Sequence, residues 1–350
     1  MVTHINIAGR RIGRGCPTFV IAEAGVNHNG GLARAHELID VAADAAVDSV
    51  KFQTFKADRL VTPDAPKAAY QIARTGASES QLDMLRRLEL SPQAHQELLD
   101  HATRRKLVFL STPFDEESAD FLDRLGVPAF KIPSGEITNL PFLAHVARKG
   151  KPLIVSTGMC TLGELEQAVA AIEATGNRRF ALLHCVSNYP SAPSDVNLRA
   201  MRTMAAAFRV PVGYSDHTLG IEVAVAAAAL SAAVIEKHFT LDRELPGPDH
   251  RASLEPAELR QMMTSIRNVE AALGDGRKQP VAAELNTAAV ARKSLVAAVP
   301  IRAGTRLTDD LIAVRRPGTG LPPAMRSVLV GRAALRDIAA GALFNLDMVA

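Results

Sequence analysis

The sequence of 350 residues contains no tryptophan and few cysteines. Its three cysteines, Cys16, Cys160 and Cys185, form no CxxC pair, which disfavours both a disulfide framework and a thiolate zinc site. Long apolar segments are also missing, because the longest uncharged run, residues 223–235, is too short to span a bilayer. The N-terminal residues lack the apolar segment of a signal peptide. We therefore expect a reduced, cytoplasmic protein without membrane contact.

Strong net charge is absent as well. The formal net charge is only +3, which gives no electrostatic case for nucleic-acid binding. This charge still suits a small anionic substrate if positive side chains gather in one cleft. Neither GxGxxG nor GxxxxGKS/T follows the first predicted strand, which counts against a doubly wound nucleotide-binding sheet.

Eight short apolar runs are present instead, separated by helical patterns. Most of these runs are apolar at consecutive positions rather than at every second position, as is typical of strands buried on both faces. They cover residues 19–25, 49–55, 107–115, 128–136, 152–159, 180–187, 210–217 and 233–240. One helical pattern, 161–176, begins with Thr161 and Glu164 at the spacing of a capping box. Eight strand–helix repeats over about 250 residues predict a (β/α)8 TIM barrel.

The sequence also predicts a second, smaller domain. The barrel is expected over residues 1–274, with a β-hairpin at 3–13 that turns at Ala8-Gly9 and plugs its bottom. Residues 275–293 would form a linker with one helical turn. Residues 294–350 contain short β-rich pieces broken by glycine and proline, which predict a small β-rich domain.

Polar or ionisable residues stand at the end of every predicted strand. They are Glu23, Lys51 with Gln53, Ser111-Thr112, Lys131 with Ser134 and Glu136, Ser156-Thr157, His184 with Ser187, Ser215-Asp216-His217, and Lys237-His238. In a parallel barrel these ends meet at one rim, where the active sites of this fold lie. Exposure of the loops to solvent would explain hydroxyl groups at the strand ends. It does not explain charged side chains within apolar sequence, because such charges are costly to bury without a partner. The pattern predicts a catalytic rim.

Two histidines at neighbouring strand ends indicate a metal site. His217 and His238 could share a divalent ion and leave positions open for water and substrate. Asp216 and Glu236 flank them and are candidates to orient the imidazoles. Few other carboxylates are placed as ligands, so the substrate would complete the coordination.

The two lysines at the rim leave two interpretations open. Lys51 or Lys131 could form a Schiff base, as in metal-free aldolases. Alternatively both clamp an anion, helped by the hydroxyls of Thr112, Ser134, Ser156 and Ser215. The number of hydroxyls favours a phosphate-plus-carboxylate pocket. By themselves, Asp249 in the loop 247–256 and Arg316 in the turn 316–323 are typical of solvated residues.

Taken together, the motifs resemble those of the sialic acid synthase family. The matching strings are "IAEAGVNHNG", "VKFQTFKAD", "ESQLDMLRRLEL", "STPFD", "FKIPSGEITNLPFL", "IVSTGM", "GYSDHTLG", "EKHFT" and "GPDH.ASL", in order over residues 19–254. Residues 294–350 resemble the antifreeze-like (SAF) domain that ends these enzymes. The resemblance implies condensation of phosphoenolpyruvate with an N-acetylhexosamine and water, giving a nine-carbon 2-keto acid and phosphate.

The resemblance also implies roles for individual residues. His217 and His238 would hold Mn²⁺ or Mg²⁺, and Glu23 would be the acid/base or water-positioning carboxylate. The residues that contact phosphoenolpyruvate in the family correspond in this sequence to Lys51, Thr112, Lys131, Ser134, Ser156 and Ser215. Sugar contacts carry over to Gln53, Glu136, Ser187, Tyr189 and Asp249, the last also counted as catalytic. Family dimers exchange their small domains, so a homodimer is expected in which Arg316 reaches the partner's site.

The identity of the sugar rests on fewer residues. N-acetylmannosamine, leading to N-acetylneuraminate, is the expected acceptor. Arg74 stands where N-acetylneuraminate synthases often carry Asn, and Ser187, beside Asn188, where some members have Asn. A diacetylated 6-deoxyhexosamine, leading to N,N'-diacetyllegionaminate, is the alternative. A Schiff-base aldolase and a non-catalytic carbohydrate-binding or assembly protein are the rival classes; the histidine pair and the intact rim argue against them.

Overall fold

The computed structural model describes residues 3–68, 70–72, 76 and 78–350. The chain divides into two compact units, Met1–Gly274 and Asp275–Ala350. This division falls at the residue where the sequence-predicted barrel domain ends. Within the described residues, no helix is long and apolar enough to cross a membrane.

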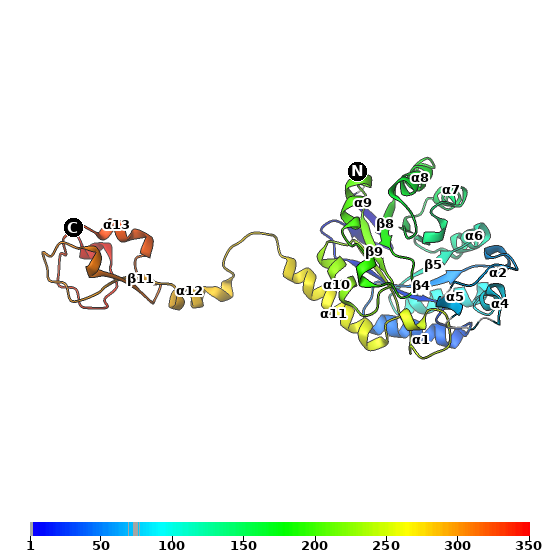
Figure 1. Ribbon diagram of the computed structural model, residues 1–350, viewed down its shortest axis with the longest axis horizontal. Coiled ribbons are helices and arrows are strands. Elements are labelled where there is room, and N and C mark those ends of the chain that lie inside the picture. Colours follow the sequence, from blue (N-terminus) through cyan, green and yellow to red (C-terminus); the bar gives the residue numbers. More distant parts are fainter. Residues whose placement is uncertain (1–2, 69, 73–75, 77) are drawn as a thin grey trace. The chain divides into compact units, whose positions relative to one another are not determined.

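The first unit is built on eight parallel strands (Figure 1). They are β3 (Phe19–Gly25), β4 (Ser49–Thr54), β5 (Val108–Pro113), β6 (Phe130–Ile132), β7 (Leu153–Ser156), β8 (Phe180–Cys185), β9 (Val212–Asp216) and β10 (Val234–His238). They are hydrogen-bonded in the order β5-β4-β3-β10-β9-β8-β7-β6, and β5 lies against β6. The sheet is therefore a nearly closed barrel, and the predicted TIM fold is confirmed.

Helices cover the outside of the barrel, which explains why the strands are apolar on both faces. They are α1 (Leu32–Asp44), α2 (Ala57–Leu60), α4 (Gln81–Arg86), α5 (Pro92–Arg104), α6 (Glu116–Leu125), α7 (Leu140–Arg148), α8 (Leu162–Glu173), α9 (Ala200–Phe208), α10 (Glu222–Ala229) and α11 (Pro256–Leu273). One apolar cluster lies between strands and helices, with Val20, Phe52 and Leu98 among its members. The predicted capping box is present at α8: Thr161 Oγ1 accepts from the Glu164 amide, and Glu164 Oε2 accepts from the Thr161 amide.

A β-hairpin closes the amino-terminal end of the barrel. Strands β1 (His4–Ile7) and β2 (Arg10–Gly13) pair antiparallel and turn at Ala8-Gly9, as the sequence predicts. Ile5, Ile7 and Ile12 belong to the apolar cluster that fills the interior of the barrel. The lower part of the barrel is thus packed with side chains, which leaves the carboxyl ends of the strands as the place for a pocket.

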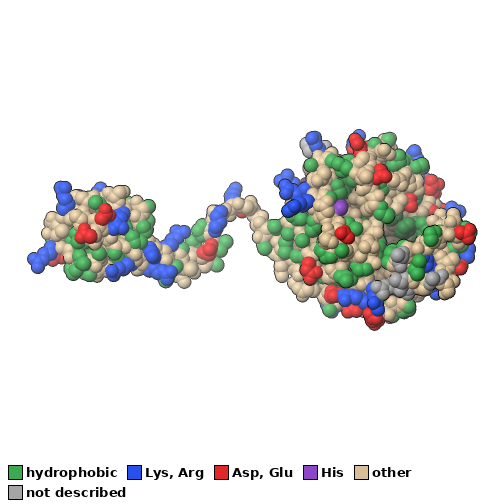
Figure 2. Space-filling model, in the orientation of Figure 1, with side chains coloured by type: hydrophobic (Ala, Val, Ile, Leu, Met, Phe, Trp, Pro, Cys, Tyr) green, Lys and Arg blue, Asp and Glu red, His purple; other side chains and the backbone are tan. Residues whose placement is uncertain are grey.

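The second unit has its own small apolar core. Strands β11 (Ser294–Ala297) and β12 (Ile312–Arg315) pair antiparallel, and α13 (Arg326–Leu329) packs nearby. Leu295, Leu307 and Phe344 are fully buried in this core. The helix α12 (Leu285–Ala291) lies in the segment that the sequence predicts to be a linker. Figure 2 shows acidic and basic side chains intermixed on the visible face of each unit.

Gly213 in β9 provides a stability test of the barrel. A Cβ atom at this position would lie 2.1 Å from the carbonyl oxygen of Val234, at the start of β10. Since this neighbour is backbone, Gly213→Ala is expected to lower the free energy of unfolding by about 3 kcal/mol. Gly163→Ala, in α8 with no atom within 4 Å of the new Cβ, is the control and is expected to be neutral or stabilising. Urea unfolding of the two variants measures the difference; equal midpoints would contradict the close packing of β9 on β10.

Candidate active site

A cavity of about 330 Å³ opens at the carboxyl ends of the barrel strands. Most of the sequence-predicted site residues line it: Glu23, Lys51, Gln53, Thr112, Lys131, Ser134, Ser156, Ser187, Tyr189, Ser215, His217 and His238. They converge because alternate residues of a strand face the interior. In β10, for example, Glu236 and His238 line the cavity, whereas Lys237 does not.

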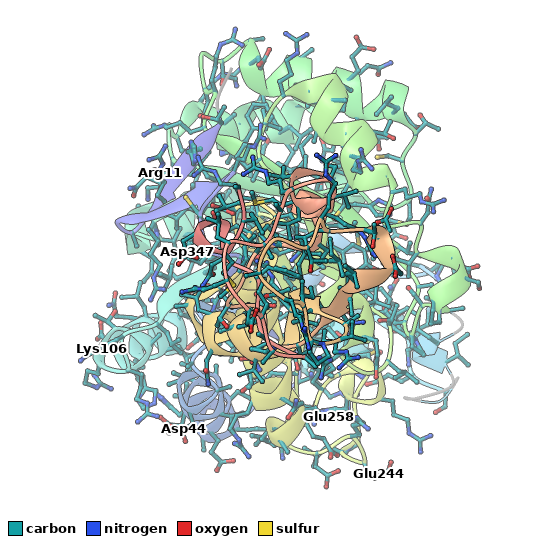
Figure 3. The ribbon with its side chains drawn as sticks, turned by 90° about the vertical axis from the view of Figure 1, so that its left-hand side faces the viewer. Arg11, Asp44, Lys106, Glu244, Glu258 and Asp347 are labelled. Carbon is teal, nitrogen blue, oxygen red and sulfur yellow. The ribbon has the colours of Figure 1, made fainter. Side chains whose placement is uncertain are left out.

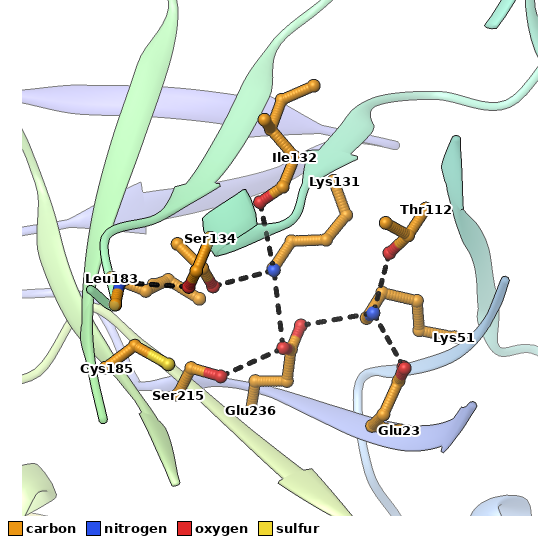
Figure 4. A network of polar contacts seen from close by, with 12 residues as sticks. Glu23, Lys51, Thr112, Lys131, Ile132, Ser134, Leu183, Cys185, Ser215 and Glu236 are labelled. Atoms are coloured by element: carbon orange, nitrogen blue, oxygen red, sulfur yellow. Dashed lines mark hydrogen bonds and ion pairs between the residues drawn. The ribbon is translucent and has the colours of Figure 1, made fainter. Parts of the chain in front are cut away.

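Lys51 lies at one side of the cavity floor. Its Nζ donates to Thr112 Oγ1 at 2.7 Å and lies 2.8 Å from Glu23 Oε2. Glu236 Oε2 is 3.8 Å from the same nitrogen (Figure 4). Lys51 is buried together with both carboxylates, and such charges are stable in the interior only when they are paired in this way.

Lys131 occupies the opposite side of the floor. Its Nζ donates to Ser156 Oγ at 2.7 Å and lies 3.4 Å from Glu236 Oε1, which also accepts from Ser215 Oγ at 3.1 Å. Burial lowers the pKa of Lys131, although the neighbouring Glu236 opposes this shift. Burial by itself would raise the pKa of Glu236, but Lys131 and Lys51 outweigh it and hold that pKa below its usual value. Glu236 is therefore the anion that the two lysines share in Figure 4.

Glu23 is the carboxylate best placed to exchange a proton near neutral pH. Burial raises its pKa to about 7, against the opposing effect of Lys51. Its Oε1 accepts a long hydrogen bond, 3.5 Å, from Gln53 Nε2. A carboxyl group with this pKa carries a proton about half of the time at pH 7, which suits general acid or base chemistry.

His217 and His238 lie beside each other at the cavity wall, with ring centroids 5.5 Å apart. The Nδ1 atom of His217 lies 2.7 Å from the carbonyl oxygen of Val186. Because a carbonyl only accepts, this nitrogen must carry the proton, and Nε2 keeps a free lone pair. Among the described residues, the buried Nδ1 of His238 has no hydrogen-bond partner. Burial, followed by the charge of His217, keeps the pKa of His238 well below its usual range, so its ring is neutral.

These features fit a divalent metal ion bound by two imidazoles. The neutral ring of His238 is a suitable ligand. Burial by itself would lower the pKa of His217, but its neighbours, Cys185 foremost, outweigh this effect and raise that pKa, so His217 must lose its second proton to bind a metal. A carbonyl that fixes one tautomer is a common partner of such ligands. The described residues contain no group of three or more His, Cys, Asp and Glu side chains arranged for a metal. That the substrate completes the coordination of a metal at this pair stays a prediction.

The predicted role of Asp216 and Glu236 as partners of the histidines is wrong. Asp216 Oδ2 lies 2.7 Å from Lys237 Nζ, and both side chains are completely buried. Asp216 Oδ1 accepts from the amide and hydroxyl of Thr218. Strand alternation is the cause, because it directs residues 216 and 237 to the outer face of the barrel. Glu236 faces inward but bonds the lysines and Ser215.

Some predicted sugar-binding residues lie outside the cavity lining. Glu136 accepts from Asn139 Nδ2 at 2.7 Å, and its side chain does not line the cavity. Asp249, in the loop after β10, is buried; burial raises its pKa to about 6, and the nearby His217 opposes this. The hydroxyl of Ser253 donates to the Asp249 carbonyl oxygen, which fixes the loop.

The loop after β10, which contains Asp249, is also held by side-chain contacts to α11. The side chain of Arg243 bonds Glu258, in the first turn of α11, and the carbonyl oxygen of Ser253. Figure 3 shows Glu244 and Glu258 at this edge of the barrel. Asp249 is thus held next to the histidine pair by contacts at both ends of its loop.

Three further predictions concern residues elsewhere. Ser187 lines the cavity, whereas the side chain of its neighbour Asn188 is exposed and donates to the Pro190 carbonyl oxygen. Arg316 directly follows β12 in the second unit, and its reach into a partner's site stays a prediction. Arg74 lies outside the described residues.

Sequence reasoning missed other residues that line the cavity. They are Ala68, Tyr70, Phe114, Pro133, Gly135, Met159 and Cys185. Glu236 was named from the sequence, but as a partner of the histidines; its place two residues before His238, on the same face of β10, could have indicated a role in the cavity itself. Tyr70 lies in the segment between β4 and β5 and stacks on Tyr189, with ring centroids 5.1 Å apart. A residue in a short helical stretch such as this one carries no usable periodic signal.

Comparisons with known proteins identify the class. Residues 38–278 match the family model of the NeuB family, and residues 292–350 match that of the SAF domain. The chain belongs to the NeuB family of nonulosonate synthases.

The relatives span almost the whole chain. An N,N'-diacetyllegionaminic acid synthase of Campylobacter jejuni is 48% identical over 91% of this chain and 96% of the relative. The human N-acetylneuraminate-9-phosphate synthase is 38% identical over 93% of this chain and 91% of the relative. A crystal structure of an N-acetylneuraminic acid synthetase from Leptospira borgpetersenii has a TM-score of 0.72 at 35% identity, covering 82% of this chain and 95% of that chain.

Proposed function

We propose that the protein condenses phosphoenolpyruvate with an unphosphorylated 2,4-diacetamido-2,4,6-trideoxyhexose, giving N,N'-diacetyllegionaminate and phosphate. The higher identity to a legionaminic acid synthase than to the human 9-phosphate synthase supports this acceptor. N-acetylmannosamine, the acceptor first expected from the sequence, is the second candidate. The observation that carries the proposal is the pair of buried lysines on the cavity floor, each bonded to a hydroxyl.

The floor offers the donors that phosphoenolpyruvate requires. Two lysine–hydroxyl pairs lie on the floor, Lys51 with Thr112 and Lys131 with Ser156. The hydroxyl groups of Ser134 and Ser215 are additional donors. Charge-assisted hydrogen bonds from such groups suit a phosphate and a carboxylate on one small molecule. Each lysine also lies within ion-pair distance of a glutamate, 2.8 Å for Lys51 and Glu23 and 3.4 Å for Lys131 and Glu236, a pairing that suits an anion clamp.

The histidine pair defines the end of the cavity where the acceptor would react. His217 and His238 would hold the divalent ion, Mn²⁺ or Mg²⁺, which as a Lewis acid polarises a carbonyl oxygen. Val186 fixes the tautomer of His217 through its carbonyl oxygen. Tyr189 packs its ring 4.1 Å from the ring of His217 and limits the approach of water from that side.

The atoms of the reaction balance as one condensation with water. A new carbon–carbon bond joins C3 of phosphoenolpyruvate to the aldehyde carbon of the sugar. Water supplies the oxygen that becomes the 2-keto group, and inorganic phosphate leaves. Glu23 is the proposed proton carrier for the water or the sugar oxygen, because its pKa is raised to about 7 at the floor.

The assay for this function follows phosphate and 2-keto acid in parallel. Purified protein with phosphoenolpyruvate, Mn²⁺ and the diacetamido sugar is expected to release both in equal amounts, and a chelator is expected to stop the release. Borohydride added during turnover is expected to trap no sugar or pyruvate on the protein. Phosphate release without keto acid, or turnover unaffected by the chelator, would contradict the proposal.

A homodimer with exchanged small domains belongs to the same proposal. If Arg316 completes the partner's site, Arg316→Ala is expected to raise the KM for the sugar without changing the mass of the dimer in light scattering. A monomer with full activity would contradict this part of the proposal.

A further inference from the structure

The cavity changes character from floor to mouth. The charged groups of the floor, such as Lys51, Lys131 and Glu236, are buried. The apolar lining residues are half-buried or exposed, and they come from the loops that follow β4, β5, β6 and β7: Ala68, Tyr70, Phe114, Pro133 and Met159. The floor therefore suits an anion, whereas the mouth suits an uncharged, partly apolar group.

Tyr70 continues an aromatic wall that starts at the histidine pair. The ring of Tyr189 lies 4.1 Å from that of His217 and 5.8 Å from that of His238. Tyr70 stacks on the other side of this wall, 5.1 Å from Tyr189 and tilted by 30°. Burial, and then the nearby Asp249, raise the pKa of Tyr70, so the phenol is neutral. An acceptor bound at the histidines would extend along these rings toward Tyr70.

Met159 presents an apolar side chain at the same mouth. It is 74% exposed and lines the cavity, so its apolar surface is available to a ligand at the mouth. Its backbone has φ of +61°, the left-handed region that non-glycine residues rarely adopt. Strained backbone of this kind concentrates at ligand sites, where it directs a side chain toward a ligand.

No lysine or arginine of the described residues lines the mouth of the cavity. Among the described residues that line the cavity, Lys51 and Lys131 are the only basic side chains other than histidine, and both are bonded at the floor. Within this described lining, a phosphate on the far end of the acceptor would meet apolar side chains rather than a cation, which is unfavourable. A methyl group there would instead be buried against an aromatic ring.

From these observations we infer that Tyr70 is a specificity-determining residue, whose ring receives the 6-methyl end of the acceptor together with Met159. The inference rests on the proposed condensation reaction and goes beyond it by naming the groups that select a 6-deoxy sugar. N-acetylmannosamine carries a hydroxyl at this end, and its burial against the ring forfeits hydrogen bonds to water. A difference of one methyl or hydroxyl group between two substrates of an apolar pocket changes kcat/KM by roughly 10- to 100-fold.

Kinetics of Tyr70 variants with two acceptors test this inference. Tyr70→Ala is expected to raise the KM for the diacetamido 6-deoxy sugar by about tenfold, and to reduce its preference over N-acetylmannosamine by a similar factor. The KM for phosphoenolpyruvate is expected to stay unchanged, because Tyr70 lies away from the lysines. Tyr70→Phe keeps the ring and is expected to restore the preference.

Tyr214→Phe is the matched control. Tyr214 is a fully buried tyrosine of β9 that does not line the cavity, so its variant is expected to keep the selectivity of the parent protein. Unchanged selectivity in Tyr70→Ala, or equal changes in both KM values, would overturn the inference while leaving the reaction intact.

Failure of the proposed function would be visible before any variant is compared, as absence of turnover by the parent protein. Calorimetric titration with the diacetamido sugar then tests Tyr70 without turnover. Binding at least about tenfold weaker in Tyr70→Ala than in the parent would support its role. Equal affinity, or no binding to the parent protein, would overturn it.

Discussion

Lys131→Met is expected to lose about 10²- to 10³-fold in kcat/KM for phosphoenolpyruvate, since removing one member of a buried charged pair typically costs 2–5 kcal/mol of binding. Methionine keeps the length and apolar stem of lysine but cannot donate to Ser156 or to a bound anion. The substitution also removes the nearer of the two lysines that pair with Glu236 and leaves Lys51, at 3.8 Å. The uncompensated carboxylate would then repel the anionic substrate as well.

Loss of stability has to be separated from loss of binding in this experiment. Breaking a buried ion pair can cost about 3–5 kcal/mol of folding free energy. The double variant Lys131→Met/Glu236→Gln removes the unpaired charge and is expected to recover stability without recovering phosphoenolpyruvate binding. Lys278→Met, at an exposed position, is the control. Near-normal kcat/KM in a folded Lys131→Met protein would refute the proposed anion site.

His238→Ala is expected to lower turnover on the order of 10³-fold, because metal-ion catalysis typically supplies several kcal/mol of transition-state stabilisation. The imidazole of His238 is buried, neutral and has an unpartnered nitrogen among the described residues, so its main contribution is as a ligand. His217→Ala should have a similar effect, and the double variant should be little worse than either single one. This non-additivity is expected when two residues act on one ion.

Direct measurement of metal binding distinguishes this effect from a structural one. Calorimetric titration with Mn²⁺ is expected to show one site in the parent protein and none in His238→Ala. His36→Gln, on helix α1 and remote from the cavity lining, serves as the matched control. Full Mn²⁺ binding by His238→Ala would show that the ion is held elsewhere.

The barrel and its floor were predictable because both depend on strand periodicity. Continuous apolar runs require burial on both faces, and polar residues at their carboxyl ends must converge in a parallel barrel. Lys51, Lys131, His217 and His238 were therefore found from the sequence and come together in the cavity. Alternation along β9 and β10 would also have placed Glu236 inside the barrel and Asp216 outside it. That assignment requires the register of the two strands to be known residue by residue.

The mouth of the cavity was not predictable in the same way. Tyr70 lies in a short helical stretch between β4 and β5, and Met159 lies in a turn after β7. The course of both segments depends on tertiary packing rather than on a repeating pattern. The buried pair of Asp216 and Lys237 looks the same in sequence as the functional residues beside it. The contacts of Glu136 with Asn139 likewise depend on the local turn after β6 rather than on residue type.

A competition between two acceptors tests the central claim most directly. The protein is incubated with phosphoenolpyruvate, Mn²⁺ and equal concentrations of the diacetamido trideoxyhexose and N-acetylmannosamine, and the products are separated by mass. We expect N,N'-diacetyllegionaminate as the main product, in an amount equal to the phosphate released. A mixture dominated by N-acetylneuraminate, or phosphate without either nine-carbon acid, would contradict the account.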